Sequence, residues 1–263
     1  MLASTVQITP SHVFRNALRV GMPVQEAQNH CACCSLHNLC LPTGLKESEM
    51  WRLDNIIGRR RRVSRDDVLY RSGDQFSSLY AIRLGHFKTQ RVDRNGSLQI
   101  TGFQMPGELL GMDAIGGGKF HCEAVALEDS EVCEIPFAKL EDLVAEMPAL
   151  LRHFHRLMSQ EIAREQNVML ILGNMRAEQQ FSAFLVNLAA RYAARGYSST
   201  RFQLRMSRED IGNYLGLTIE SISRLLTRFK KRGLISVDKR EVQILDAEAL
   251  KAIAAGTTPC LPM

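Results

Sequence analysis

The sequence predicts an α+β protein made of an N-terminal β-roll (a double-stranded β-helix, or jelly roll), one long helix and a C-terminal winged helix-turn-helix. Three observations support this prediction. Short β-favouring segments separated by glycines occupy residues 68–136, which is typical of a small antiparallel barrel or jelly roll. An apolar repeat at helical spacing occupies residues 148–174, and two capped amphipathic segments joined by a glycine occupy residues 206–235.

Length and composition exclude several classes of protein. At 263 residues the chain can hold one large or two ordinary domains, and 45% hydrophobic with 23% charged residues is typical of a folded chain. The sequence has no apolar run long enough for a membrane span, and its first residues do not resemble a secretory signal, so we expect a cytoplasmic protein. No Ser/His/Asp set, phosphate-cradling Gly-Lys loop or HExxH motif occurs, so we do not expect an enzyme.

Changes in the sequence pattern divide the chain into five parts. Within the β-rich part, Asp93, Arg94, Asn95 and Gly96 separate two β-favouring segments and predict a tight hairpin, because Asn and Gly accept a positive φ. Before the β-rich part, residues 45–57 have the apolar spacing of a short helix. The predicted parts are a loosely ordered arm with a cysteine loop (1–44), the β-roll (45–147), a dimerisation helix (148–175), the helix-turn-helix unit (176–250) and a tail (251–263).

The long helix carries a stripe of apolar residues at steps of three and four, the spacing of a coiled-coil seam, which predicts a homodimer interface. Glu165 interrupts the stripe, and two copies facing each other would repel, so we expect a marginal dimer that can be switched. Two alternatives remain: the helix packs on its own domain, and Glu165 lies at the edge of the seam. His153 and His155 have no evident partner and are expected at the surface. The predicted interface residues are Leu151, Phe154, Met158, Ile162, Glu165 and Met169.

The C-terminal unit contains a helix-turn-helix pattern. Ser207 is placed to cap a first helix, Gly216 permits a sharp turn, and Thr218 is placed to cap a second helix. Residues near the start of the second helix of such a motif meet base edges, where Arg recognises guanine and Glu accepts from cytosine. Residues 237–245 then predict a hairpin wing. The predicted base-reading residues are Glu220, Ser223 and Arg224.

The distribution of charge agrees with a nucleic-acid partner. The chain carries a net charge of +5, yet residues 201–240 alone hold ten Lys or Arg against four acidic residues, a net +6. A basic block on a nearly neutral body is typical of a unit that binds the phosphates of double-stranded DNA. The alternative is an ordinary helical hairpin with solvated surface charges.

Four of the seven cysteines lie within ten residues, which favours metal or redox chemistry over a secreted disulfide framework. Cys31, Cys34 and Cys40 have the spacing C-x2-C-x5-C, so three thiolates on one loop can hold a soft metal centre but leave one ligand to be supplied. From spacing alone an iron–sulfur cluster, a zinc site and redox-active or inert thiols all remain open. The candidates for the fourth ligand are Cys33, Cys122, Cys133 and Cys260, or His30 and His37 if the metal is zinc.

The order of these elements resembles the Fnr branch of the Crp/Fnr transcription regulators, over about residues 30 to 250. The resemblance implies an oxygen-labile [4Fe-4S] cluster that oxygen converts to [2Fe-2S], a homodimer, and anaerobic binding to TTGAT-type inverted repeats at promoters of anaerobic metabolism, which are activated or repressed. It also implies that Glu220, Ser223 and Arg224 read the half-site. The motifs that carry the resemblance are GELLGMDAIGGG (107–118), VCEIPF (132–137) and DIGNYLGLTIESISRLL (210–226). The implied cluster ligands are Cys31, Cys34, Cys40 and Cys133.

The resemblance implies further contacts and leaves some thiols open. It implies that the hairpin tip at Asp93, Arg94, Asn95 and Gly96 contacts RNA polymerase, although a plain solvated turn is the alternative. It implies no cyclic nucleotide, because the related Crp proteins use an Arg-Ser pair where this chain has Phe120 and His121. The extra thiols leave open whether Cys33 replaces Cys34, or Cys122 replaces Cys133, as a ligand. Cys260 is expected to be a free thiol.

The sequence predicts a DNA-binding protein, and its resemblance to the Fnr branch implies an oxygen-responsive transcription regulator. One alternative keeps the same fold but replaces the oxygen-labile cluster with a zinc site or redox-active thiols. A second alternative, a ferredoxin-like electron carrier, does not account for residues 176–245.

Overall fold

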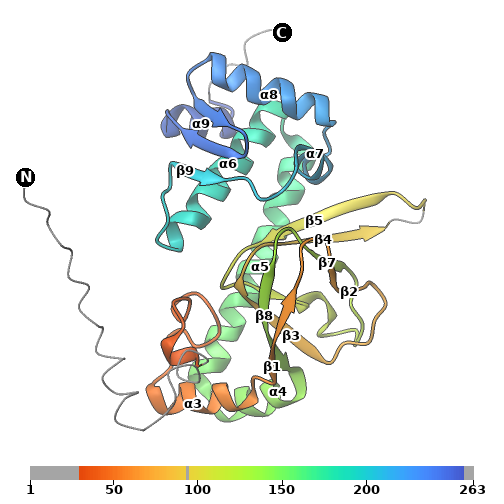
Figure 1. Ribbon diagram of the computed structural model, residues 1–263, viewed down its shortest axis with the longest axis vertical. Coiled ribbons are helices and arrows are strands. Elements are labelled where there is room, and N and C mark those ends of the chain that lie inside the picture. Colours follow the sequence, from red (N-terminus) through yellow and green to blue (C-terminus); the bar gives the residue numbers. More distant parts are fainter. Residues whose placement is uncertain (1–29, 93–94, 258–263) are drawn as a thin grey trace, which may run out of the picture.

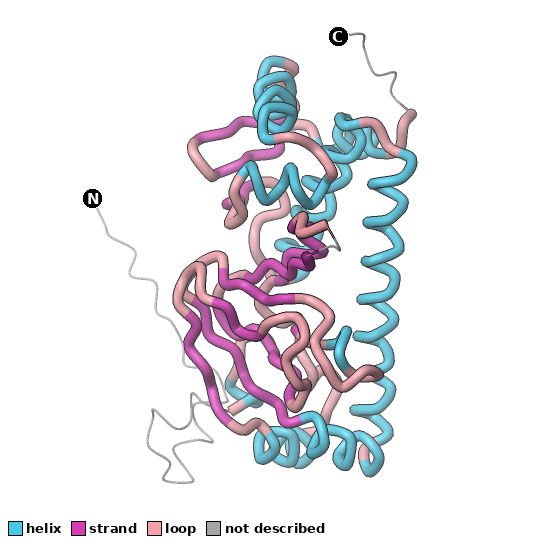
Figure 2. The backbone as a smooth tube through the Cα atoms, turned by 90° about the vertical axis from the view of Figure 1, so that its right-hand side faces the viewer, coloured by secondary structure: helices cyan, strands magenta, loops and turns pink. Residues whose placement is uncertain are grey.

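The computed structural model describes residues 30–92 and 95–257 and has the predicted architecture. A β-roll forms one part, and a helical unit with a small sheet forms the other (Figure 1). Helix α5 (Pro148–Asn174) runs along one side of the β-roll and reaches the C-terminal unit, as Figure 2 shows from the side. Three predicted features lie outside the described residues: the part of the arm before residue 30, the hairpin residues Asp93 and Arg94, and Cys260.

The β-roll consists of two four-stranded antiparallel sheets, ordered β1-β8-β3-β6 and β2-β7-β4-β5. Phe87, Val132 and Phe120 fill the space between the sheets and are 4% exposed or less. Strands β4 and β5 form the predicted hairpin, with Val92 opposite Leu98. The strands are β1 (Arg59–Val63), β2 (Val68–Tyr70), β3 (Ser78–Leu84), β4 (Phe87–Val92), β5 (Leu98–Gln104), β6 (Leu109–Leu110), β7 (Glu123–Ala126) and β8 (Ser130–Pro136).

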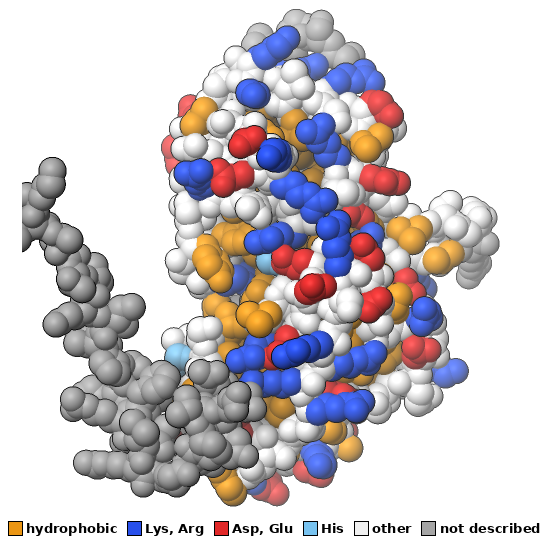
Figure 3. Space-filling model, viewed as in Figure 1, with side chains coloured by type: hydrophobic (Ala, Val, Ile, Leu, Met, Phe, Trp, Pro, Cys, Tyr) orange, Lys and Arg blue, Asp and Glu red, His pale blue; other side chains and the backbone are white. Residues whose placement is uncertain are grey.

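Strand β1 lies outside the region where the sequence predicts strands. Its sequence, RRRRV, has no alternation of apolar and polar residues, which is the usual signal of a strand. Pairing with β8 along its whole length holds β1 in the sheet. Because β1 is an edge strand, its side chains can remain near solvent. Arg59, for example, donates to Glu134 at 3.1 Å. Figure 3 shows a group of basic side chains on the face that carries this sheet.

The helices follow the predicted pattern closely. Helix α5 has Pro148 at its first turn, where the missing N–H has no helical partner to lose. Helix α9 reaches Ala254, beyond the predicted unit boundary at residue 250, because Leu250 and Ile253 are buried in the C-terminal core. The remaining elements are η1 (Cys31–Cys33), α3 (Glu47–Ile56), η2 (Met112–Ala114), α4 (Phe137–Glu146), α6 (Ala177–Ala194), β9 (Arg201–Gln203), α7 (Arg208–Leu215), α8 (Ile219–Lys231), β10 (Ile235–Asp238), β11 (Glu241–Ile244) and α9 (Ala247–Ala254).

The core of the C-terminal unit is continuous with one edge of the β-roll. Helices α6, α7 and α8 bury a common apolar cluster that includes Phe181 and Phe229. Ile100 and Phe103 of β5 belong to the same cluster, and the Phe103 ring lies 5.0 Å from the Tyr214 ring. The two units are therefore joined by apolar packing as well as by the chain. No helix within the described residues combines the length and the apolar character needed to cross a bilayer.

The packing of α6 predicts a strong effect on stability. Phe181 is completely buried, with its ring centroid 5.6 Å from that of Phe229. We expect Phe181→Ala to lower the free energy of unfolding by about 3–5 kcal/mol, because the substitution leaves a cavity that cannot collapse fully. Urea unfolding followed by far-UV circular dichroism measures the change. Trp51→Ala, at a residue 62% exposed on α3, is the control and is expected to change little. Equal midpoints for the two variants would contradict this account of the core.

Candidate functional site

The structure brings Cys31, Cys34, Cys40 and Cys133 around one small cavity. The first three lie on the loop before α3, and Cys133 lies on β8 with Ala81 of β3 opposite it. The other walls are mostly apolar. They include Leu36, Leu41, Leu53, Ile57, Ile82 and Ile135.

Two helices hold the cysteine loop in place. The Cys31 N–H donates to Asp54 Oδ1 of α3 at 2.7 Å, and His153 Nε2 of α5 donates to the Cys40 carbonyl at 3.0 Å. His153 is only 6% exposed, so the expectation that it lies at the surface is wrong. The first turns of α5 pack on the β-roll, and this packing turns His153 toward the loop. His155, on the same helix, is exposed.

The cavity disfavours charged thiolates unless a positive group accompanies them. Burial raises the pKa of Cys40 to about 12 and raises the pKa of Cys31 further. Burial also raises the pKa of Cys133, although the nearby Arg60 guanidinium opposes the rise. A bound metal centre would supply that positive charge, and four sulfur donors suit a soft metal. Within residues 30–92 and 95–257 no three His, Cys, Asp or Glu side chains already stand where they could hold a metal ion.

The other candidate ligands lie differently. Cys33 is exposed, and Cys122 lies in a separate cavity, where its sulfur is 3.7 Å from Thr101 Oγ1. His30 Nδ1 is 3.3 Å from Asp54 Oδ2, and His37 Nδ1 is 2.9 Å from the Cys34 carbonyl oxygen. Among these four residues only His37 lines the same cavity as the four grouped cysteines.

The helix-turn-helix has the caps that the sequence predicts. Ser207 Oγ accepts from the Asp210 N–H at 3.0 Å, and Thr218 Oγ1 accepts from the Ser221 N–H at 3.2 Å. Gly216 ends α7 with φ of 65°, a conformation that favours glycine. Gly212 allows α7 to approach the turn, because a Cβ there would lie 2.6 Å from the Leu217 carbonyl oxygen.

The polar side of α8 faces away from the core. Glu220 and Arg224 are exposed, and Ser223 is half-buried and accepts from Arg208 Nη1 at 3.3 Å. Hydrogen bonds to its own backbone and to Thr218 lower the pKa of Glu220, so this carboxylate is ionised at neutral pH and can accept hydrogen bonds. Strands β10 and β11 pair as the predicted wing.

The predicted interface residues on α5 divide into two groups. Phe154 is 7% exposed and packs in the core of its own β-roll, and Leu151 and Met158 are half-buried. Ile162 and Met169 are 53% and 66% exposed. The exposed group also includes Glu165, Leu170 and Leu172. The C-terminal half of α5 therefore presents an uncovered apolar face in the single chain.

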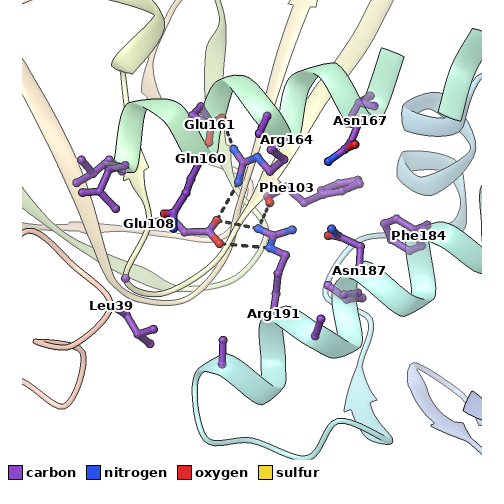
Figure 4. Close-up of a pocket in the computed structure, with 18 of the residues that line it drawn as sticks. Leu39, Phe103, Glu108, Gln160, Glu161, Arg164, Asn167, Phe184, Asn187 and Arg191 are labelled. Atoms are coloured by element: carbon purple, nitrogen blue, oxygen red, sulfur yellow. Dashed lines mark hydrogen bonds and ion pairs between the residues drawn. The ribbon is translucent and has the colours of Figure 1, made fainter. Parts of the chain in front are cut away.

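Glu108, which no sequence motif singles out, lies at the junction of three parts of the fold. Figure 4 shows it between Arg164 of α5 and Arg191 of α6. Its carboxylate accepts from Arg164 at 3.2 Å, from Arg191 at 2.7 Å and from Arg195 at 2.6 Å. Burial alone would raise the pKa of Glu108, but the three guanidiniums together lower it to about 2. Because its partners are far away in the sequence, no local signal predicts this cluster.

Comparison with known proteins agrees with the fold and the helix-turn-helix. Residues 179–253 match a family model of a Crp-like helix-turn-helix domain, and residues 60–147 match one of a cyclic nucleotide-binding domain. FixK2 from Bradyrhizobium japonicum has a similar structure, with a TM-score of 0.68 at 24% identity, covering 74% of this chain and 96% of FixK2. These matches show a Crp-like helix-turn-helix domain joined to a β-roll of the cyclic nucleotide-binding type, in the fold that FixK2 shares.

Relatives that match most of the chain identify its family more narrowly. The transcriptional regulatory protein btr of Bordetella pertussis is 47% identical over 88% of this chain and 96% of btr. The anaerobic regulatory protein of Pasteurella multocida is 48% identical over 91% of this chain and 88% of its own length. The fumarate and nitrate reduction regulatory protein of Escherichia coli is 47% identical over 87% of this chain and 91% of its own length. The chain belongs to the Crp/Fnr family, is of the Fnr type, and is a regulator rather than an enzyme.

The cyclic nucleotide-binding match describes the architecture of the β-roll. At the place where the resemblance puts the phosphate-binding pair of Crp proteins, Phe120 is buried and its ring stacks on Tyr70 with centroids 3.8 Å apart. The backbone N–H of His121 donates to Asp113 at 2.9 Å. The aromatic ring therefore fills space where a cation would be needed, and we still predict that this roll binds no cyclic nucleotide.

The Glu108 cluster predicts a specific dependence of stability on pH. The ordinary pKa of 4.5 falls to about 2 in the fold, so the ionised carboxylate contributes its full stabilisation above pH 4.5 and loses it as the pH falls toward 2. We expect Glu108→Gln to be destabilised by about 3 kcal/mol at pH 7. Urea unfolding at pH 7, 4 and 3 should show the difference between the two proteins shrinking with acid. A difference that is constant with pH would contradict the role of the charge.

Proposed function

We propose that this protein is an oxygen-responsive, global transcription regulator that binds DNA as a homodimer when oxygen is absent. The observation that carries the proposal is the grouping of Cys31, Cys34, Cys40 and Cys133 around one apolar cavity. Anaerobic regulation is also what the names of two relatives describe, the anaerobic regulatory protein and the fumarate and nitrate reduction regulatory protein.

The four grouped cysteines are the proposed ligands of a [4Fe-4S] cluster. Four thiolates in a cavity with apolar walls suit such a cluster, and the separate position of Cys122 favours Cys133 as the fourth ligand. When bound, the cluster supplies an oxygen-labile connection between the loop and β8. The chain itself holds the loop through Asp54 and His153, so order in the loop depends on both helices and the ligands.

The proposed dimer forms through the exposed half of α5. Ile162 and Met169 provide apolar area, and Glu165 lies between them as a like charge that weakens pairing. A two-fold dimer presents two copies of α8, which requires an inverted repeat with half-sites about one helical turn apart. Glu220, Ser223 and Arg224 are the proposed readers of TTGAT-type half-sites. The proposed contact for RNA polymerase is the hairpin tip at Asp93, Arg94, Asn95 and Gly96.

Anaerobic purification tests the proposal directly. The protein is isolated without oxygen, its visible absorption, iron and sulfide are measured, and air is then added while sedimentation is followed. Iron with sulfide, a broad absorption that changes in air, and loss of dimer would support the proposal. Zinc without colour, and a dimer unaffected by air, would replace the oxygen sensor with a zinc-dependent regulator of the same fold.

The choice of the fourth ligand can be tested by substitution. We expect Cys133→Ser to abolish the iron content and anaerobic DNA binding, because it removes a sulfur donor from the cavity. Cys122→Ser is the matched control, since this thiol is also partly buried in the β-roll but lies in another cavity. Iron analysis and a DNA mobility-shift assay report the outcome. The reverse pattern would transfer the ligand role to Cys122.

Base reading by α8 can be separated from phosphate binding. We expect Arg224→Ala to weaken binding to an inverted TTGAT repeat by about 1–3 kcal/mol and to relax specificity, because a bidentate contact to guanine is lost. Lys231→Ala is the control, which should weaken binding to all duplexes similarly and reduce the salt dependence. Fluorescence anisotropy with specific and scrambled duplexes at two salt concentrations measures both. Equal losses on the two duplexes for Arg224→Ala would count against its role.

The marginal dimer predicts a gain from removing one charge. We expect Glu165→Ala to strengthen the dimer in air, because the repulsion between facing carboxylates disappears. Gln166→Ala, at a neighbouring exposed and neutral residue, should leave association unchanged. Analytical ultracentrifugation measures the dissociation constants. Sedimentation of Glu165→Ala identical to that of the parent would remove Glu165 from the interface.

A further inference from the structure

We propose that Glu108 couples the cysteine loop to the C-terminal unit within one protomer, so that disorder in the loop loosens the docking of helix α6. This device acts inside a single chain and is separate from dimerisation. Only its connection to oxygen rests on the proposed function. The coupling between the loop and α6 rests on three contacts in the structure.

The first contact joins the cysteine loop to the turn that carries Glu108. Leu39, next to Cys40, lies against Gly107, and a Cβ at Gly107 would be 3.0 Å from the Leu39 Cβ. Gly107 has φ of 90°, which favours glycine, so the turn can lie close to the loop. Leu39 and Glu108 also line one open cavity of about 530 Å3 between the β-roll, α5 and α6. Loss of order at Leu39 therefore removes the packing from one side of the Glu108 turn.

The second contact joins that turn to α6. Arg191 donates to Glu108 at 2.7 Å and to the Phe103 carbonyl at 2.6 Å. Arg195 donates to Glu108 at 2.6 Å and to the Pro106 carbonyl at 2.7 Å. The Arg195 side chain is only 5% exposed, so its guanidinium is largely shielded from water, whereas Glu108 is 23% exposed. Two arginines one helical turn apart thus hold both the carboxylate and the backbone of the turn.

The charges make this junction sensitive to the position of Glu108. Arg164, Arg191 and Arg195 converge on one carboxylate, with Glu161 as a second acidic partner of Arg164. If Glu108 moves away, the three partly buried guanidiniums lose their common acceptor. Breaking these ion pairs costs free energy, because the positive charges then lie close together with little water around them. We therefore expect two states of this junction: one in which the arginines pair with Glu108, and one in which these ion pairs are broken and α6 is less tightly docked.

The third contact joins α6 to α8, the helix that carries the proposed base-reading residues. Helix α6 packs on α8 through the Phe181 and Phe229 rings, and Arg228 of α8 donates to Glu178 of α6 at 2.5 Å. A shift of α6 therefore shifts the helix that carries the proposed base-reading residues. Coupling along these contacts changes both ends together, the cysteine loop and α6.

Helix α7 has a separate attachment to the β-roll, which provides an internal reference. Lys88 donates to Asp210 at 2.7 Å, and the Asn213 side chain pairs with the edge strand β5. The Ile100 N–H donates to Asn213 Oδ1 at 2.6 Å, and Asn213 Nδ2 donates to the Leu98 carbonyl at 2.7 Å. These bonds do not involve Glu108, so α7 should remain attached when the Glu108 junction opens.

Hydrogen–deuterium exchange on the full chain, purified without oxygen, tests the proposal. We expect Glu108→Gln to speed exchange at residues 188–194 of α6 roughly fivefold or more, and to speed exchange at residues 36–41 of the loop, with α7 unchanged. Glu146→Gln is the matched control, because it removes an acidic partner of Arg52 far from this junction. Unchanged α6 in Glu108→Gln would overturn the proposal, and faster α6 with an unchanged loop would overturn the coupling.

A second variant approaches the junction from the loop. We expect Leu39→Ala to speed exchange in α6 as well, because it removes packing from Gly107 in the turn that carries Glu108. No change in α6 would overturn the coupling. If Glu108→Gln fails to fold, Arg191→Gln removes the same ion pair from the other side and has the same expected result. Iron is measured in every sample, so absence of a cluster is recorded separately from the exchange result and does not obscure it.

Discussion

The pairing of strand β8 is the constraint on which the rest of the structure depends. β8 lies between β1 and β3, and its register places Cys133 opposite Arg60 on one side and Ala81 on the other. Residues of β3 and β8 form one wall of the cavity, and the cysteine loop forms another. Residues separated by about a hundred positions are thereby brought together, and α4 and α5 follow directly from the end of the same strand.

Local patterns in the sequence were sufficient for elements whose causes are local. The caps at Ser207 and Thr218 and the turn at Gly216 depend on residues within a few positions, so the helix-turn-helix could be predicted with its boundaries. The same holds for α5, which begins at a proline and has a sustained apolar repeat. Strand β1 could not be predicted, because its partner β8 lies far away and its arginines show no alternation.

The candidate site was predictable to a similar extent. Spacing identified the three loop cysteines, but the proposed fourth ligand followed only from the family resemblance, because nothing local distinguishes Cys133 from Cys122. Their separation into two cavities is a property of the fold. His153 and Glu108 were missed for the same reason. Each is defined by a partner on another element, the Cys40 carbonyl in one case and three guanidiniums in the other.

The cysteine loop and the Glu108 junction share one physical logic. In both places the fold gathers groups that are unfavourable unless a partner is present: buried thiols that resist ionisation around one cavity, and three arginines around one carboxylate. Because Leu39 and Gly107 lie between them, the two places are adjacent and not independent. A regulator needs an element with two states of similar free energy, and a junction that depends on a single charge is more easily biased than a hydrophobic core. Because α6 packs on α8 within one apolar cluster, the proposed loosening of α6 would turn a small change at the loop into a change in how α8 is presented.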